Sequence, residues 1–196
     1  MKELIFFSHN KHKINEVIKI LQNNKIKILT LYDFPNTYKP KETGETFKDN
    51  ALIKSTFGFK SFGLPCFADD SGICISAIKN LPGIKSKRFL LENGGLDQTF
   101  KMIINETKIK NNYKAFFQTS IALTIDNQHS VYFDGIVSGE ISNKPLGSQG
   151  FDYDPIFIPC GTNKTYAQML VEEKNKISHR AIAIKKLKNF ILNLID

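Results

Sequence analysis

The stretch Phe67-Ala68-Asp69-Asp70-Ser71-Gly72 is the most informative part of this chain. An apolar run from Leu64 to Ala68 predicts a strand, and that strand ends on two adjacent carboxylates, a hydroxyl and a glycine. Open α/β folds bind ligands where their strands end, and adjacent carboxylates are tolerated more readily when a cation or a shared proton offsets their repulsion. Asp, Ser and Gly also form ordinary turns. The segment alone therefore supports a ligand site and a plain turn about equally.

Hydrophobic spacing on either side of this segment predicts strands and helices. Alternating apolar residues predict long strands over 113–125 and 130–141, joined as a hairpin by Asp126-Asn127-Gln128. The other expected strands are 4–7, 26–30, 64–68, 72–78 and 156–158, and the expected helices are 11–22, 46–59, 96–106, 166–174 and 178–194. No repeat or linker divides the 196 residues. We therefore expect a mixed α/β architecture around one long sheet, with residues 1–196 forming a single domain of two lobes.

The chain carries a formal net charge of +8 and has a sequence pI near 9.3. Such a charge is typical of proteins that contact nucleic acid phosphates, but it also arises from a lysine-rich composition. The basic residues are spread along the chain, and their densest cluster, Lys185-Lys186 with Lys188, lies in an expected helix that is otherwise rich in apolar residues. We therefore attribute the net charge to a lysine-rich composition rather than to nucleic acid binding. The charge would also attract an anionic small molecule.

Cysteine usage and hydropathy indicate the compartment. Cys66, Cys74 and Cys160 are odd in number, show no CxxC spacing and lie among apolar residues. This pattern predicts reduced, buried thiols in a cytoplasmic protein, without a disulfide framework or a cysteine metal site. No apolar run approaches the roughly 20 residues that span a bilayer. We therefore expect a cytoplasmic protein that does not contact a membrane.

Two expected helices begin with cations, where the helix dipole disfavours them. Lys11 and Lys13 lie in the first turn of one helix, and His179 and Arg180 in the first turn of another. Backbone N–H groups beside cations form a receptor for phosphate oxygens, although lysine is common throughout this chain. The sequence contains no P-loop, GxGxxG, HExxH or GxSxG motif. Carboxylates without soft ligands suit magnesium, so we expect metal-assisted chemistry on a phosphorylated small molecule.

Six segments, in order along the chain, match the motifs of one enzyme family. They are Ser8-His9-Asn10-Lys11-His12-Lys13 with Glu16, residues 42–51 with Lys54, residues 68–72, Leu81-Pro82-Gly83 with Arg88, residues 150–155, and Lys174 followed by Ile177-Ser178-His179-Arg180. On these motifs the sequence resembles the inosine/xanthosine triphosphate pyrophosphatases, which remove non-standard purine nucleotides. The likeness runs from residue 8 to residue 180, and six motifs in register are far more specific than one.

The resemblance implies an activity, a fold and an assembly. The activity is hydrolysis of dITP, ITP or XTP to the nucleoside monophosphate and pyrophosphate, with Mg²⁺ as the cofactor. The fold is an elongated, two-lobed α/β structure around a long mixed, twisted β-sheet with a central substrate cleft. The resemblance also implies a homodimer that acts on free nucleotides, and we expect it to bind no nucleic acid.

The resemblance also implies site residues, motif by motif. Asp70 is the general base and a metal ligand, and Glu42 is the second metal ligand. The triphosphate contacts are Ser8, His9, Asn10, Lys11, His12, Lys13 and Lys54. The remaining substrate contacts are Ser71, Phe151, Asp152, Tyr153, Asp154, Lys174, His179 and Arg180. Phe151 would stack on the nucleobase, and donors from the His179-Arg180 end would meet its 6-keto oxygen. For Asp69 we expect a structural role, accepting hydrogen bonds that hold the turn, with direct catalysis as the alternative.

Three positions depart from the family pattern. His9 replaces a glycine, which restricts how closely the backbone can approach phosphate. Asp49 replaces a glutamate and is shorter by one methylene. Asp152 replaces another glycine, and Asp tolerates a left-handed backbone better than most residues. None of the three changes removes a residue to which we assign chemistry.

Two alternatives stay open. The first is a basic nucleic-acid-binding module without catalysis, whose affinity would fall steeply with salt. Carboxylates at the binding mouth argue against it, because they repel a phosphate backbone. The second is a pyrophosphatase that acts on other nucleotides, such as pyrimidine or methylated ones.

Overall fold

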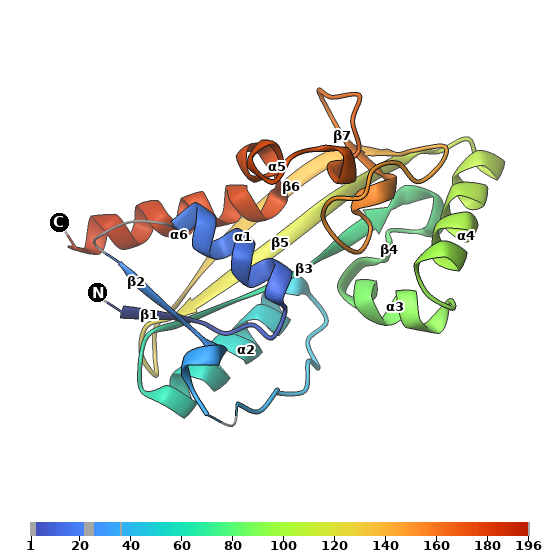
Figure 1. Cartoon of the computed structure of the whole chain (residues 1–196). Helices are drawn as coiled ribbons and strands as arrows, with labels where there is room; N and C mark the ends of the chain where they lie inside the picture. The colour runs from blue at the N-terminus through green and yellow to red at the C-terminus, as the bar shows by residue number, and fades with distance from the viewer. Residues whose placement is uncertain (1–2, 22–25, 36, 196) are drawn as a thin grey trace. The chain divides into compact units, whose positions relative to one another are not determined.

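The computed structural model describes residues 3–21, 26–35 and 37–195 and has seven strands and six α-helices (Figure 1). The strands are β1 (Glu3–Phe6), β2 (Lys27–Thr30), β3 (Cys66–Ile75), β4 (Leu81–Pro82), β5 (Lys114–Thr124), β6 (Ser130–Ile141) and β7 (Phe157–Pro159). The helices are α1 (Lys11–Leu21), α2 (Phe47–Phe62), α3 (Ser86–Glu92), α4 (Leu96–Ile109), α5 (Val171–Ile177) and α6 (His179–Ile195). All strands join one sheet of order β2-β1-β3-β5-β6-β7, with β4 paired to β3. The expected mixed α/β fold is confirmed.

The chain divides into two compact units. We call Met1–Asp70, Thr119–Gly135 and Arg180–Asp196 unit 1, and Ser71–Gln118 and Ile136–His179 unit 2. Strands β3, β5 and β6 contribute residues to both units. The expectation of a single domain with two lobes stays a prediction. Within the described ranges, no helix combines the length and the apolar character needed to cross a membrane.

In unit 1, helices cover both faces of β1. This strand pairs in parallel with β2 and with β3, and its successive side chains point to opposite faces of the sheet. Leu4 and Phe6 pack against α1 and α6, whereas Ile5 and Phe7 pack with apolar side chains of α2 (Figure 1). The apolar packing holds β1 from both sides, so the loop that follows it begins from a fixed position.

Helix α2 has well-defined ends. Thr46 accepts a hydrogen bond from the Asp49 N–H (3.1 Å), and the Asp49 carboxylate accepts one from the Thr46 N–H (3.0 Å), which forms a capping box. Gly63 closes the other end with a φ of 68°, the left-handed conformation that favours glycine. Asp49, which departs from the family pattern, therefore serves as a cap.

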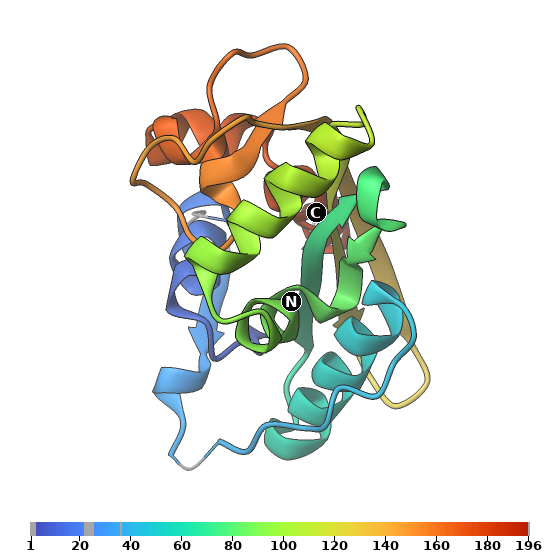
Figure 2. The same cartoon turned by 90° about the vertical axis from the view of Figure 1, so that its right-hand side faces the viewer.

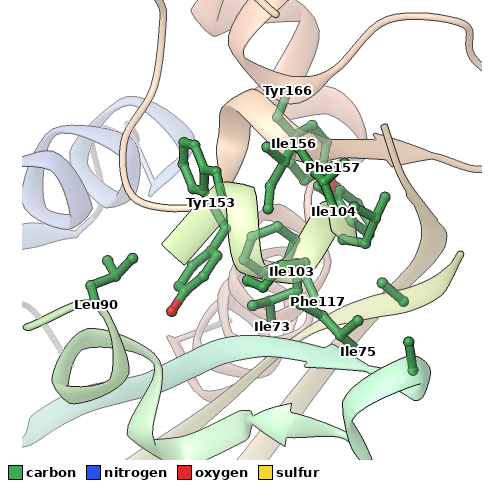
Figure 3. Close-up of a cluster of buried hydrophobic side chains, with 14 of the residues drawn as sticks. Ile73, Ile75, Leu90, Ile103, Ile104, Phe117, Tyr153, Ile156, Phe157 and Tyr166 are labelled. Atoms are coloured by element: carbon green, nitrogen blue, oxygen red, sulfur yellow. The ribbon is translucent and has the colours of Figure 1, made fainter. Parts of the chain in front are cut away.

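Unit 2 has its own core, rich in aromatic residues (Figure 3). Its buried side chains include Ile73, Ile75, Leu90, Ile103, Ile104, Phe117, Tyr153, Ile156, Phe157 and Tyr166. Helices α3 and α4, seen together in Figure 2, contribute Leu90 and the two adjacent isoleucines. The ring of Phe117 meets that of Phe157 edge-on at 4.8 Å, and Tyr166 lies 5.2 Å from Phe157. This packing supports the residues of unit 2 that we expect to contact substrate.

The prediction that a strand ends at Ala68 is wrong. Strand β3 runs without interruption from Cys66 to Ile75, so Asp69 and Asp70 lie within it, and the turn that Asp69 was expected to hold is a strand instead. Both carboxylates are buried beside cations, and this pairing offsets the cost of placing charges in mid-strand. The boundary between the two units falls immediately after Asp70.

Most other predicted elements are confirmed with small shifts at their ends. The helix predicted over 11–22 is observed as α1, and Gln22 lies outside the described residues. Residues 86–92, expected as part of a loop, form α3, which is too short for a clear apolar period. The helix expected over 166–174 is instead a 3₁₀ turn, Tyr166–Gln168, followed by α5, because Met169 and Leu170 between them are extended.

Candidate functional site

The loop after β1 is organised around Asn10. Its side-chain Oδ1 accepts hydrogen bonds from the backbone N–H of His12 (2.9 Å) and of Lys13 (3.3 Å), and Ser8 Oγ accepts one from the Asn10 N–H (3.2 Å). Asn10 is therefore a neutral N-cap of α1. The predicted helix start at Lys11 is confirmed. Two of the backbone amides that we expected to receive phosphate donate to Asn10 in this structure.

His9 keeps an ordinary backbone where the resembled family has glycine. Its Nε2 lies 3.5 Å from Thr37 Oγ1, and its ring meets the Phe7 ring edge-on at 5.8 Å. Within the described chain, the non-glycine residues with positive φ are Lys79, Asn80, Asn111 and Asp152. The backbone at His9 thus does not need the conformational freedom of glycine. Histidine in place of glycine therefore adds a side chain to the loop without straining its backbone.

Four charged residues of unit 1, Lys13, Glu16, Asp69 and Arg180, form what we call the Asp69 network. Asp69 Oδ2 accepts a hydrogen bond from Arg180 Nε (3.2 Å) and lies 2.9 Å from Lys13 Nζ. Arg180 Nη1 donates to Glu16 Oε2. Only 2% of Arg180 is exposed. Two cations and two carboxylates from α1, β3 and α6 therefore neutralise one another inside unit 1.

These contacts keep Asp69 ionised. Burial opposes the charged carboxylate, but Lys13, Arg180 and Lys54 together outweigh burial and hold the pKa of Asp69 well below its usual range. Burial also lowers the pKa of Lys13, although Asp69 opposes that change. Asp69 is therefore suited to holding cations and poorly suited to taking up a proton near neutral pH.

The adjacent carboxylate, Asp70, has different surroundings. Its Oδ1 lies 3.4 Å from Lys54 Nζ, and the same ammonium lies 3.6 Å from Glu42 Oε1. Its Oδ2 accepts a hydrogen bond from Asn50 Nδ2 at 3.2 Å. We call Glu42, Asn50, Lys54 and Asp70 the Asp70 cluster. Burial, which Lys54 and Lys13 offset only in part, raises the pKa of Asp70 above its ordinary value, as expected of a carboxylate that acts as a base.

The Asp70 cluster has donors that fit a magnesium ion. The described residues contain no group of three or more His, Cys, Asp and Glu side chains that could hold a metal ion. Glu42 and Asp70 nevertheless contact the same ammonium group, and Glu42 also lies 3.7 Å from the exposed ammonium of Lys39. Mg²⁺ usually takes one or two protein carboxylates and fills its remaining positions with water and substrate phosphate oxygens. Two neighbouring carboxylates that supply hard oxygen donors fit that requirement.

In unit 2, several predicted substrate residues gather around a second buried ion pair. Lys174 Nζ donates to Asp154 Oδ2 at 2.6 Å. The same ammonium lies over the ring of Phe151 (4.8 Å) and the ring of Tyr166 (5.5 Å), within the range of cation–π contacts. A Cβ on Gly150 would overlap Asp154 Oδ2, so only glycine allows the turn to approach this carboxylate.

Asp152 and Tyr153 shape the turn between Phe151 and Asp154. Asp152 has a φ of 51°, which confirms that it adopts the left-handed backbone expected of it. The Tyr153 hydroxyl donates to the Ser86 carbonyl at 2.8 Å, and its ring is buried. Tyr153 thus anchors the turn within unit 2, and its contact with substrate stays a prediction.

His179 and Ser71 also belong to unit 2. The His179 ring stacks on Phe117, with a centroid distance of 4.6 Å and an interplanar angle of 10°. Arg180 follows directly but belongs to unit 1 and the Asp69 network. Ser71 lies in β3 as the first residue of unit 2. The predicted residues therefore form two groups, with the expected triphosphate and metal residues in unit 1 and most of the others in unit 2.

Sequence reasoning assigns no role to Glu16 or Asn50, although both lie in the quoted motifs. Glu16 contacts Arg180, 164 positions away, and no local pattern reveals such a pairing. Asn50 precedes Lys54 by four residues on α2, so the two side chains share one helix face. That spacing is a signal from which the contact of Asn50 with Asp70 could have been expected.

The family model of the Ham1 family matches residues 4–190. This chain belongs to the Ham1 family. The match spans every member of the Asp69 network and the Asp70 cluster, and it confirms the family resemblance identified from the motifs.

Ham1 relatives match this chain over nearly its whole length. It is 40% identical over 193 residues to the dITP/XTP pyrophosphatase of Porphyromonas gingivalis, with 98% of each chain covered. It is 41% identical over 209 residues to the dITP/XTP pyrophosphatase of Borrelia duttonii, with 100% of each chain covered. The Staphylococcus aureus Ham1 protein matches the structure with a TM-score of 0.86 at 33% identity, over 98% of this chain and 99% of that one. A HAM1 protein from Coxiella burnetii matches with a TM-score of 0.88 at 32% identity, over 98% and 100%.

Proposed function

We propose that this protein is a nucleoside triphosphate pyrophosphatase that hydrolyses dITP, XTP and ITP to the monophosphate and pyrophosphate. Membership of the Ham1 family and relatives named dITP/XTP pyrophosphatase support this activity. The observation that carries it is the contrast between two adjacent carboxylates. Asp69 is held ionised by Lys13 and Arg180, whereas the pKa of Asp70 is raised by burial beside Lys54. Enzymes separate the roles of neighbouring acids by such differences in environment.

Asp70 is the general base in this proposal. Its carboxylate accepts a proton from a water molecule whose oxygen attacks the α-phosphorus, and the bond from that phosphorus to the bridging oxygen breaks to release pyrophosphate. The raised pKa makes Asp70 a stronger base than an exposed aspartate. Lys54 and the loop from Ser8 to Lys13 bind the phosphates. Glu42 and Asp70 would hold Mg²⁺, which neutralises phosphate charge when it is bound.

Residues of unit 2 recognise the nucleobase of the substrate in this proposal. Phe151 offers a ring for stacking, and Lys174 and His179 offer donors to the 6-keto oxygen of hypoxanthine or xanthine. Adenine has a 6-amino group at that position, so donor would face donor. An unsatisfied buried group costs about 1–3 kcal/mol, and sites built on a specific hydrogen bond reject such analogues strongly.

A substrate panel tests the proposal. Purified protein with Mg²⁺ is supplied with dITP, XTP, ITP, dATP, dGTP, dTTP and a methylated purine nucleotide, and pyrophosphate and orthophosphate are measured separately. We expect pyrophosphate from the first three, at least about 100-fold faster than from dATP, and loss of turnover with EDTA. Orthophosphate as the first product would rule out attack at the α-phosphorus. Preference for dTTP or the methylated nucleotide would favour the other class of pyrophosphatase.

We also propose that the protein is a cytoplasmic homodimer that acts on free nucleotides. The three cysteines are free thiols, which suits a reducing compartment. Cys66 and Cys74 are buried as expected, but the expectation is wrong for Cys160, which is exposed in the turn after β7. Light scattering on the purified chain measures the mass of the assembly, and fractionation of cells locates the protein. Tight, salt-sensitive binding to an oligonucleotide, unaffected by Asp70→Asn, would support the nucleic-acid-binding alternative instead.

A further inference from the structure

The side chain of Asn50 joins two parts of the Asp70 cluster. Its Nδ2 donates to Asp70 Oδ2 at 3.2 Å, and its Oδ1 accepts a hydrogen bond from the Gly44 N–H at 2.8 Å. Gly44 lies two residues after Glu42, the other expected metal ligand. One buried amide, 3% exposed, therefore contacts Asp70 directly and ties down the segment that carries Glu42.

Both neighbours select the same orientation of this amide. A backbone N–H can only donate, so the Asn50 atom that faces Gly44 must be the oxygen. An ionised carboxylate can only accept, so the atom that faces Asp70 must be the NH₂ group. An amide is the group that satisfies both partners at once, because an aspartate offers no donor and an alanine offers neither a donor nor an acceptor.

The backbone around Asn50 is built for this contact. A Cβ on Gly44 would lie 2.8 Å from both Asn50 N and Asn50 Oδ1, and 2.5 Å from Asp49 Cβ, so only glycine lets the segment come this close. The capping box of Thr46 and Asp49 fixes the first turn of α2, which begins at Phe47, three residues before Asn50. On the same face, one turn later, Lys54 reaches the other oxygen of Asp70.

Stability alone gives little reason for Asn50 to be there. Asparagine is a poor helix former, and a buried polar side chain costs free energy unless it is hydrogen-bonded. One partner of its side chain, Asp70, belongs to the Asp70 cluster, and the other, Gly44, lies two residues after Glu42. We therefore attribute the presence of this amide to the geometry of that cluster.

We propose that Asn50 is a positioning residue: its amide locks the orientation of Asp70 and the position of the Glu42 segment, so that both carboxylates are preorganised to hold a divalent cation. This inference rests on the proposed function and deepens it. Partners that orient metal ligands typically change metal affinity or activity by about 10–100-fold when they are removed. In this proposal Asn50 contacts neither the phosphates nor the nucleobase of the substrate. Its removal should therefore change turnover and metal affinity rather than substrate binding.

Variants at two positions of α2 separate positioning from folding. Asn50→Ala removes both hydrogen bonds, whereas Asn50→Asp keeps an acceptor for Gly44 but loses the donor to Asp70. Ser55→Ala is the matched control, because Ser55 is equally buried on α2 but bonds to Thr124 Oγ1 (2.8 Å). With dITP, both Asn50 variants should lower kcat by about 10–100-fold with KM changed by less than about threefold. Ser55→Ala should keep kcat within about twofold.

A second readout does not depend on turnover. Mn²⁺ is titrated into each protein without nucleotide, free Mn²⁺ is followed by electron paramagnetic resonance, and melting curves verify that each variant is folded. Asn50→Ala should bind Mn²⁺ about tenfold more weakly than wild type and Ser55→Ala. A folded Asn50→Ala variant with the kcat and Mn²⁺ affinity of the control would overturn the inference, as would a wild-type protein that neither binds Mn²⁺ nor turns over dITP. If wild type binds Mn²⁺ but does not hydrolyse dITP, the proposed function fails, while the Mn²⁺ affinities still decide the role of Asn50.

Discussion

The two units bury charge in different ways. In unit 1, Lys13 and Arg180 balance Glu16 and Asp69, and beside them one ammonium, Lys54, faces two carboxylates. In unit 2, a single pair, Asp154 and Lys174, is enclosed by aromatic rings. The two carboxylates of the Asp70 cluster suit a cation-bound polyanion, whereas one ion pair between rings suits a flat, weakly charged group. The distribution of charge thus distinguishes the residues expected to bind the phosphates from the residues expected to bind the nucleobase.

The largest effect should come from Asp70→Asn. The amide fills nearly the same volume but cannot accept a proton, so pyrophosphate release should fall on the order of 10³-fold. The fold should persist, because Lys54 keeps Glu42 as an ion-pair partner when the charge of Asp70 is removed. Pyrophosphate assays and thermal melts followed by circular dichroism measure both results. Wild-type turnover in this variant would show that Asp70 is not the general base.

Arg180→Met should cause the largest loss of stability in unit 1. It removes the guanidinium that contacts both Glu16 and Asp69, and breaking a buried ion pair by removing one partner costs about 3–5 kcal/mol. Urea denaturation measures the free energy of unfolding. Arg180→Lys keeps the charge but not the two-sided geometry, so its loss should be intermediate. Equal stability of Arg180→Met and wild type would contradict the view that this network holds unit 1 together.

Lys174→Met should destabilise unit 2 by somewhat less, about 3 kcal/mol. Asp154 keeps the Phe151 N–H as a donor at 2.9 Å, which offsets part of the loss. Combining Lys174→Met with Asp154→Asn removes both charges, and we expect the double variant to recover at least half of the lost stability in the same denaturation experiment. Strictly additive losses would show that Lys174 and Asp154 do not stabilise each other and would weaken the comparison with unit 1.

The smallest effect should come from Asp152→Gly. Glycine adopts the φ of 51° without strain but loses more backbone entropy on folding, so the free energy of unfolding should change by no more than about 1 kcal/mol. Gly150→Ala, two residues earlier, should be clearly more damaging, because the added methyl group overlaps the Asp154 carboxylate. Urea denaturation of both variants tests this ranking, and the reverse order would show that the turn does not depend on that close approach.

Local patterns predict much of this fold. The helical spacing of Ile14, Val17 and Leu21 and the alternation over 113–125 predict α1 and β5 within a few residues. The course of β3 is not predictable in this way, because acids normally end an apolar strand. Asp69 and Asp70 stay inside the strand only because cations from α1, α2 and α6 meet them.

The site is predictable to the extent that its motifs are specific. They single out Glu42, Lys54 and Asp70, which the structure brings together. They do not reveal that the guanidinium of Arg180 is enclosed by carboxylates, because that depends on packing between residues far apart in sequence. Nor do they reveal Asn50, whose contact with Asp70 depends on where β3 passes α2.

The N-cap of α1 shows why a neutral side chain suits position 10 better than a charged one. An aspartate at position 10 would satisfy the amides of His12 and Lys13 as well as Asn10 does, since the two residues cap helices about equally. It would also place a permanent anion at the start of a helix that we expect to receive a triphosphate, and the two would repel each other. The carboxamide of Asn10 caps the helix without that repulsion. This one side chain therefore allows the start of α1 to be well ordered and still to bind a polyanion.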